Sequence, residues 1–237
     1  MTTSRLRSLA LAIAAATATA ASAQRLVAQD ARLSAIADSS TRTRVTAVIE
    51  RARSASLPVE PLVDKALEGA RKRAPDARIL EAVSSLAARL DSSRRALGTA
   101  STEAELVAAA AALQAGVGPV VLTQLRRERP GRSLAIPLVV LGDLVTRGVP
   151  HDTASALILL VAHEGLGDET LLAIQRDVQR DVRDGAHPAA AAAIRARGAV
   201  SGASTRLRPT RGPLAGGAAS SASPAGSGAM HPAGTKP

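Results

Sequence analysis

Turns that stop helices recur along the middle of this chain, and they limit the folds that it can adopt. In each of six segments a turn residue is followed by an apolar residue or Ala, then usually by Pro or Gly, and then by a new apolar pattern. A Gly after a helix readily takes the left-handed conformation, the next apolar residue folds back on the last turn, and Pro blocks continuation. The pattern predicts helices joined by tight turns at Ser56, Arg73, Gly116, Gly148, Gly165 and Gly185.

The spacing of these turns predicts a repeated unit. The intervals from Ser56 to Arg73 and from Gly148 to Gly165 are both 17 residues, and Gly148 follows Gly116 by 32. A helix of about 12 residues plus a turn gives one helix pair every 34 residues or so, the length of αα-hairpin repeats that stack into curved arrays. The signatures of tetratricopeptide and ankyrin repeats are absent from the sequence. We therefore predict an all-α fold, either degenerate αα-hairpin repeats or a compact irregular helical bundle.

Apolar residues between positions 26 and 197 recur at the three- and four-residue spacing of a helix face. Thr102 precedes Glu105 by three residues, which is the spacing of a capping box and predicts that a helix begins there. Charged residues that alternate in sign on the far side of residues 171–182 are interpreted as a solvated face. The two clearest apolar faces are Ile79, Leu80, Val83, Leu86, Ala87 and Leu90 in one segment and Leu171, Ile174, Val178 and Val182 in another.

Residues 133–145, SLAIPLVVLGDLV, form a nearly continuous apolar run that contains Pro137. The β-branched residues of this run would also suit a buried strand. A helix fits better, because Pro130 and Gly131 stop the preceding element and Pro137 falls near the first turn of the next one, where a missing N–H costs little. Because the run is apolar on all sides, we expect it to be the most deeply buried helix.

The chain contains no Phe, Tyr, Trp or Cys. Aromatic side chains bury the most area per residue, so the core must instead be built from Leu, Val, Ile and Ala. Flat rings are also the usual stacking platforms for sugars and unpaired bases, and their absence argues against carbohydrate-binding and single-strand nucleic-acid-binding modules. Without Cys, neither a disulfide nor a lipid-modified cysteine is available.

Three segments are predicted from composition. Residues 1–23 combine two arginines, a short Ala-rich apolar stretch and Ala-Ser-Ala before Gln24, the layout of a secretory signal peptide cleaved near Ala23. A membrane anchor is disfavoured because the apolar stretch is short and interrupted by threonines. Residues 24–197 form the helical domain. Residues 198–237 are rich in Gly, Ala, Ser and Pro, lack acidic groups and apolar periodicity, and are expected to be a disordered tail.

The net charge of +10 is spread unevenly along the chain. The predicted signal peptide and tail carry six of the basic residues, which leaves 24 basic and 20 acidic groups in residues 24–197. No nucleic-acid partner is expected, and an exported chain would meet an anionic envelope surface or an acidic protein instead. Arginine outnumbers lysine 27 to 3 and alanine is abundant, which indicates a GC-rich bacterial genome and a periplasmic or secreted location.

His163 and Glu164 form the segment that most suggests chemistry. A zincin would need His-Glu-x-x-His on one helix, but position 167 is Gly. The alternative metal site would combine His163 and Glu164 with His151 and Asp168. We interpret His163 and Glu164 instead as the last turn of a helix that Gly165 ends, so no metal ligand is predicted. The remaining histidines, His187 and His231, lie at unrelated spacings.

Other motifs are explained by helix ends. Ser133 lies in Gly-Arg-Ser-Leu-Ala with no preceding strand, so it is predicted to cap a helix and not to act as a nucleophile. The Gly-x-Gly within residues 115–121 lacks a third Gly and a preceding strand. Two carboxylate pairs sit where helices begin, which suits the helix dipole; they are Glu103 with Glu105 and Asp168 with Glu169. No catalytic or cofactor-binding residue and no cofactor are predicted.

The sequence therefore predicts an exported, non-enzymatic helical protein of the bacterial envelope that binds an envelope protein or peptide or acts as a scaffold. The alternative is a hydrolase or metal-dependent enzyme that uses His163 and Glu164, with Ser133 as a further candidate. A third hypothesis is that the basic tail contacts an anionic envelope surface.

Overall fold

The computed structural model describes residues 31–207, and within them every regular element is a helix, which confirms the all-α prediction. The predicted signal peptide and residues 208–237 of the predicted tail lie outside the described residues. No helix of the described part is long and apolar enough to cross a membrane. The helices are α2 (Ser39–Ser54), α3 (Glu60–Arg71), α4 (Asp76–Leu97), α5 (Glu103–Gln114), α6 (Pro119–Glu128), α7 (Ala135–Thr146), α8 (His151–His163), α9 (Asp168–Arg183) and α10 (Pro188–Leu207).

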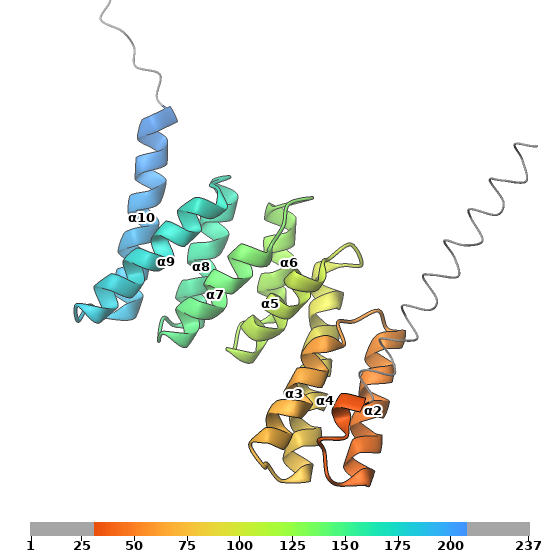
Figure 1. The fold of residues 1–237 in the computed structure, drawn as a ribbon. Coiled ribbons are helices and arrows are strands. Elements are labelled where there is room, and N and C mark those ends of the chain that lie inside the picture. The colour runs from red at the N-terminus through yellow and green to blue at the C-terminus, as the bar shows by residue number, and fades with distance from the viewer. Residues whose placement is uncertain (1–30, 208–237) are drawn as a thin grey trace, which may run out of the picture.

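Successive helices alternate between two layers. In one layer α2 packs on α4, α4 on α6, α6 on α8 and α8 on α10, and in the other α5 packs on α7 and α7 on α9. The layers are joined by contacts of α3 and α5 with α4, of α7 with α8 and of α9 with α10. Figure 1 shows the result as an elongated array with α2 and α10 at opposite ends. This arrangement is that of stacked αα-hairpins.

All six predicted turn residues have positive φ, from 52° at Arg73 to 98° at Gly116. The same two backbone hydrogen bonds close each of these turns. After α7, for example, Gly148 N–H donates to Val145 O and Val149 N–H to Leu144 O, both at 3.0 Å. These are the bonds of the Schellman motif, which satisfies the last carbonyls of a helix. The sequence pattern therefore identified these helix ends correctly.

Two further turns also have positive φ, at Gly98 (87°) and Gly131 (68°). The pattern missed Gly98 because Thr99 and Ala100 follow it, where most of the other turns have an apolar residue and then Pro or Gly. When Gly98 is included, the interval from Gly98 to Gly131 is 33 residues and the interval from Gly131 to Gly165 is 34. The period fails earlier in the chain because α4 is 22 residues long.

The apolar run is helical, as predicted, and forms α7, but it is not buried on all sides. Val139 is 56% exposed, whereas Leu138, Leu141 and Leu144 are fully buried. The reason is that α7 lies in an outer layer, where it packs on α5, α8 and α9 and leaves its remaining side to solvent. Five of the 12 residues of α7 are buried, against six of 12 in α5, so the prediction that this helix is the most deeply buried was wrong.

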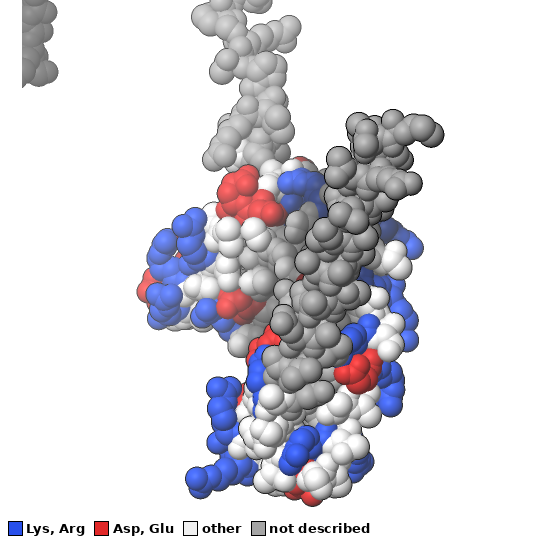
Figure 2. All heavy atoms as spheres, turned by 45° about the vertical axis from the view of Figure 1, so that its right-hand side comes forward, with Lys and Arg blue, Asp and Glu red and all other residues white. Residues whose placement is uncertain are grey.

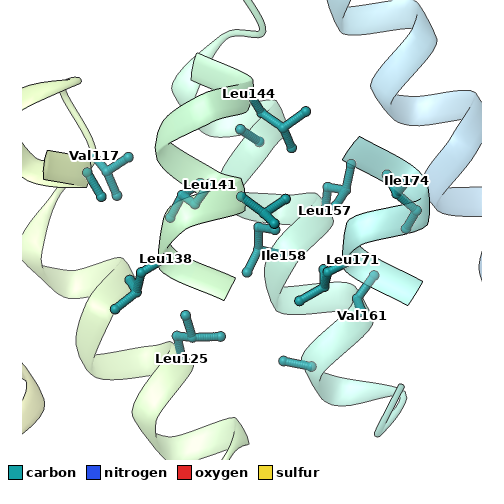
Figure 3. Packing of buried hydrophobic residues seen from close by; sticks show 14 of the residues in the cluster. Val117, Leu125, Leu138, Leu141, Leu144, Leu157, Ile158, Val161, Leu171 and Ile174 are labelled. Carbon is teal, nitrogen blue, oxygen red and sulfur yellow. The ribbon is translucent and has the colours of Figure 1, made fainter. Parts of the chain in front are cut away.

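Two clusters of buried Leu, Val, Ile and Ala side chains form the core. One extends from α2 to α5 and the other from the end of α4 to α10. Figure 3 shows part of the second cluster, where side chains from α7, α8 and α9 meet. Small residues bring the helices close, since a Cβ on Gly142 of α7 would lie 3.9 Å from the Ala112 backbone of α5. Small residues thus supply contact area that aromatic side chains would otherwise provide.

The capping box at Thr102 and Glu105 is present, and Glu105 does more than close it. Its carboxylate is 3% exposed and accepts hydrogen bonds from Arg126 Nη2 at 2.7 Å and from Leu134 N–H at 2.8 Å. Burial opposes the charged form of Glu105, but the N–H groups of Thr102 and Leu134, together with Arg126, outweigh it and lower its pKa. One carboxylate therefore joins the beginnings of α5 and α7 to α6.

Other polar contacts tie the later helices together. Asp143 of α7 accepts hydrogen bonds from Gln175 and Gln179 of α9, each at 2.9 Å. Arg195 of α10 binds both carboxylate oxygens of Asp181 on α9, each at 2.7 Å. The charged face predicted to be merely solvated therefore also contacts the last helix.

The last helix passes the boundary that the sequence predicts at residue 198 and continues to Leu207. Buried Ala191, Ala192 and Ala196 anchor its first half against the array. Once a helix is nucleated, each further residue adds a hydrogen bond at little cost. A composition rich in Gly and Ala therefore does not end it at Gly198.

Replacement of Gly116 by Ala should lower the free energy of unfolding by about 1 kcal/mol, because a Cβ is disfavoured in the left-handed region. A Cβ there would meet no atom within 4 Å, so the effect isolates the backbone conformation. Gly198→Ala, in a helix with equally open surroundings, should raise stability by about 0.5–1 kcal/mol. Urea denaturation measures both; a change of the same sign in the two variants would contradict the assignment.

Removal of the Glu105 carboxylate by Glu105→Ala should destabilise the fold by about 3–5 kcal/mol, because it leaves Arg126 without its buried partner. The control is Glu103→Ala in the same helical turn, whose exposed carboxylate contributes less than about 1 kcal/mol through the helix dipole. Chemical denaturation of the two variants should show this difference. Equal losses of stability in the two variants would mean that the Glu105 carboxylate acts only through the helix dipole, as any acid in the first turn of a helix does.

Candidate functional site

A groove of about 440 Å³ lies where α3, α4 and the end of α5 meet. Its floor contains small side chains, and its rim is charged. The volume falls within the range of about 300–1,000 Å³ that is typical of ligand sites. The lining residues are Lys65, Glu68 and Gly69 of α3, Lys72 and Ala74 just after α3, Arg78, Ile79, Glu81, Ala82, Ser85 and Arg89 of α4, and Gln114 of α5.

The groove follows from the unequal lengths of the helices. At 22 residues α4 is longer than the 12-residue helices α3 and α5, and both pack on it. The two shorter helices do not pack closely on each other, although α5 packs on α7 and α7 on α9. A shallower hollow of about 630 Å³, lined by α3 and Val107 of α5, continues from the groove at Lys65 and Glu68. The layer is thus interrupted between α3 and α5.

Gly69 sets how closely α3 approaches α4 at one end of the groove. A Cβ at this position would lie 2.8 Å from Cγ1 of Ile79, closer than side-chain atoms normally come. A Gly at this contact therefore lets the two helices touch. Farther along this pair of helices, side chains of α3 and α4 form the walls of the groove.

A carboxylate between two lysines crosses one wall of the groove. Glu68 lies 2.7 Å from Lys65 Nζ and 2.5 Å from Lys72 Nζ. Hydrogen bonds from Lys65 and then from Lys72 lower the pKa of the Glu68 carboxyl from 4.5 to about 2. Glu68 therefore stays ionised at any physiological pH and pairs with both ammonium groups.

On the face seen in Figure 2, Lys and Arg lie interspersed with Asp and Glu and with uncharged surface. Basic side chains are therefore dispersed over this face. The groove is locally more basic, since four cationic side chains line it against two carboxylates.

His163 and Glu164 occupy the positions predicted for them at the end of α8. His163 is the last helical residue and Glu164 the C-cap, and Gly165 follows with φ of 66°. The His163 side chain is 72% exposed, and its Nδ1 lies 3.2 Å from a Glu128 carboxylate oxygen. The segment is thus a helix end, and its histidine contacts a neighbouring helix.

Asp168 contacts an arginine that the sequence did not single out. Arg129, at the end of α6, is 3% exposed, and its Nη2 lies 2.7 Å from Asp168 Oδ1. Asp168 therefore links the start of α9 to α6, besides complementing the helix dipole as predicted.

Ser133 is not the N-cap of α7, a position that Leu134 takes. Its hydroxyl accepts from Ala135 N–H at 3.3 Å, while the Leu134 N–H is satisfied by Glu105. The predicted cap position is therefore wrong by one residue, although the Ser133 hydroxyl does accept from the first N–H of α7.

The remaining predicted candidates do not converge. His151 begins α8 and pairs with its neighbour Asp152 at 2.8 Å, and His187 is exposed just before α10. In residues 31–207, no three His, Asp or Glu side chains are arranged to hold a metal ion. His231 lies outside the described residues.

The sequence patterns did not single out the groove residues. Lys65 and Lys72 belong to no catalytic motif, since Leu62 and Gly69 stand where a Ser-x-x-Lys motif would have Ser. A usable signal was present, however, because Glu68 stands three residues after one lysine and four before the other, on one helix face. These are two of only three lysines in the chain.

A second hollow of about 540 Å³ lies between α9 and α10 at the end of the array. It contains the 60% exposed Ile194 and the small residues Gly198, Ala199 and Gly202. Its charged lining residues include Asp177 and Arg195, whose side chains approach each other. It therefore presents fewer available charges than the groove at α3 and α4.

Comparison with protein-family models, with curated protein sequences and with solved structures found no match for this chain.

Replacement of Lys72 by Ala should raise the pKa of Glu68 from about 2 toward its ordinary value of 4.5, because one of its two cations is lost. A ¹³C titration of the Glu68 side chain by NMR measures this. Since folding lowers this pKa, the bridge favours the folded state above about pH 4.5, and that contribution disappears as the pH falls through about 2. Arg95→Ala, an exposed change elsewhere on α4, should leave the titration unchanged; an equal shift there would rule out the local bridge as its cause.

Proposed function

We propose that this chain is a non-enzymatic binding or scaffolding protein of the bacterial cell envelope that recognises a protein or peptide segment in the groove between α3, α4 and α5. The observation that carries the proposal is the interruption of the α3–α5–α7–α9 layer over α4. Helical arrays commonly use such extended concave surfaces to bind partners. The proposal includes export of the chain before it folds, with cleavage of the predicted signal peptide near Ala23.

The geometry of the groove supports a macromolecular partner. The hollow beside Val107 extends the groove along α3, so a segment of chain could contact both. The small floor residues would let a peptide backbone approach closely, and the ordered charges at the rim would give it a register.

The geometry around His163 gives the enzyme alternative no comparable support. Its ring is largely exposed, and its nearest charged partner is a carboxylate on another helix. General acid/base catalysis works best in a site that excludes water. We therefore favour a binding role for this chain over the enzymatic alternative.

Photo-crosslinking in the cells that produce the protein would test this function. A benzophenone amino acid would replace exposed Ser85 in the groove, or exposed Ala156 on α8 as the control. We expect discrete crosslinked products at position 85 that mass spectrometry traces to one segment of one partner, and none of these at position 156.

Absence of products specific to position 85, or the same products from both positions, would contradict a binding role for the groove. Circular dichroism of both purified variants would confirm that they remain helical. Fractionation of the same cells reports the compartment independently.

A further inference from the structure

One cation of the groove is not engaged by a carboxylate. Lys65, Lys72 and Arg78 each have one within 3.4 Å, on Glu68 or Glu81. No carboxylate among the described residues forms an ion pair with Arg89, on the α4 wall of the groove. The difference matters because an arginine in a groove without an acidic partner is free to bind an anion.

The Arg89 side chain is held in place by neutral groups. Its Nη1 donates to the Ser85 hydroxyl at 2.7 Å, and its Nη2 lies 3.4 Å from the Gln114 amide oxygen, near the limit for a hydrogen bond. Nε is buried and has no partner among the described residues. Because a guanidinium carries five N–H donors, Arg89 keeps donors to spare on both terminal nitrogens.

This arrangement suits a carboxylate. Arginine binds carboxylates through two parallel N–H donors, and a guanidinium already oriented by its neighbours loses little freedom on binding. Glu68 and Glu81 already pair with the other three cations of the lining, so Arg89 is left to bind an acidic group, and one guanidinium matches the single charge of a carboxylate. The weak contact with Gln114 is the one that an incoming carboxylate would replace.

We propose that Arg89 anchors a side-chain carboxylate of the bound segment, so that the groove selects acidic peptides. This inference rests on the proposed function, since it names the chemistry of the segment that the groove receives. The small lining residues Ala74 and Ala82 accommodate the peptide backbone, while Lys72 and Arg78 at the rim add longer-range attraction.

Fluorescence anisotropy with defined peptides and the purified full chain would test the proposal. The acidic probe is fluorescein-Gly-Ser-Ala-Asp-Ala-Glu-Ala-Asp-Ser-Gly-amide, and the neutral probe replaces its acids by Asn and Gln. At low salt we expect the acidic probe to bind at least about tenfold more tightly. Arg89→Gln should reduce its affinity to that of the neutral probe, and Arg89→Lys, which keeps the charge without the paired donors, should give an intermediate loss.

The control is Arg95→Gln, the same change of charge on the same helix at a residue that is 72% exposed and outside the groove. It should leave both affinities within about twofold. Equal loss in Arg89→Gln and Arg95→Gln, equal binding of the two probes, or no binding of either would each overturn the carboxylate anchor. The crosslinking variant lacks the Ser85 hydroxyl that helps to orient Arg89, so discrete products at position 85 together with equal binding of the two probes would keep the groove as a binding site for a partner that lacks acids.

Discussion

The left-handed residue that ends each helix is the constraint on which the rest of the structure depends. From α2 to α9, each helix is followed within a few residues by a position with positive φ. Such a residue turns the chain in a short space, so the next helix begins close to the end of its predecessor. With every connection short, successive helices have little choice but to alternate between two layers. Ser56 and Arg73 adopt this conformation without being Gly, which shows that the surrounding turn imposes it.

The absence of aromatic residues shapes how these layers pack. Leu, Val, Ile and Ala fill both core clusters, and contacts at Gly69 and Gly142 bring helices to short range. Apolar packing of this kind is not directional. Specific geometry comes from a few polar contacts that join different helices, above all the buried Glu105 carboxylate. The same helices that pack closely elsewhere leave α3 and α5 apart over α4, and the proposed binding groove is the consequence.

Prediction from the sequence succeeded where the cause is local. The capping box at Thr102 and the turn after His163 depend on neighbouring residues, and both lie where the pattern placed them. It failed where a distant partner decided the outcome. Ser133 was predicted as a cap because its own surroundings suit one, but Glu105 reaches across from α5 to bind the adjacent N–H. Arg129 and Arg89 resembled every other arginine in the chain, because burial and the identity of the partner are set by packing.

The sequence by itself determined that the chain is helical, where most helices end, and which residue types form the core. These properties depend on backbone preference and on apolar periodicity, which act over a few residues. Only the tertiary structure decided that α3 and α5 remain apart and that Arg89 faces the resulting groove with no acidic partner among the described residues. Those features depend on the relative lengths and offsets of helices that meet in space, and turn patterns along the chain contain no measure of them.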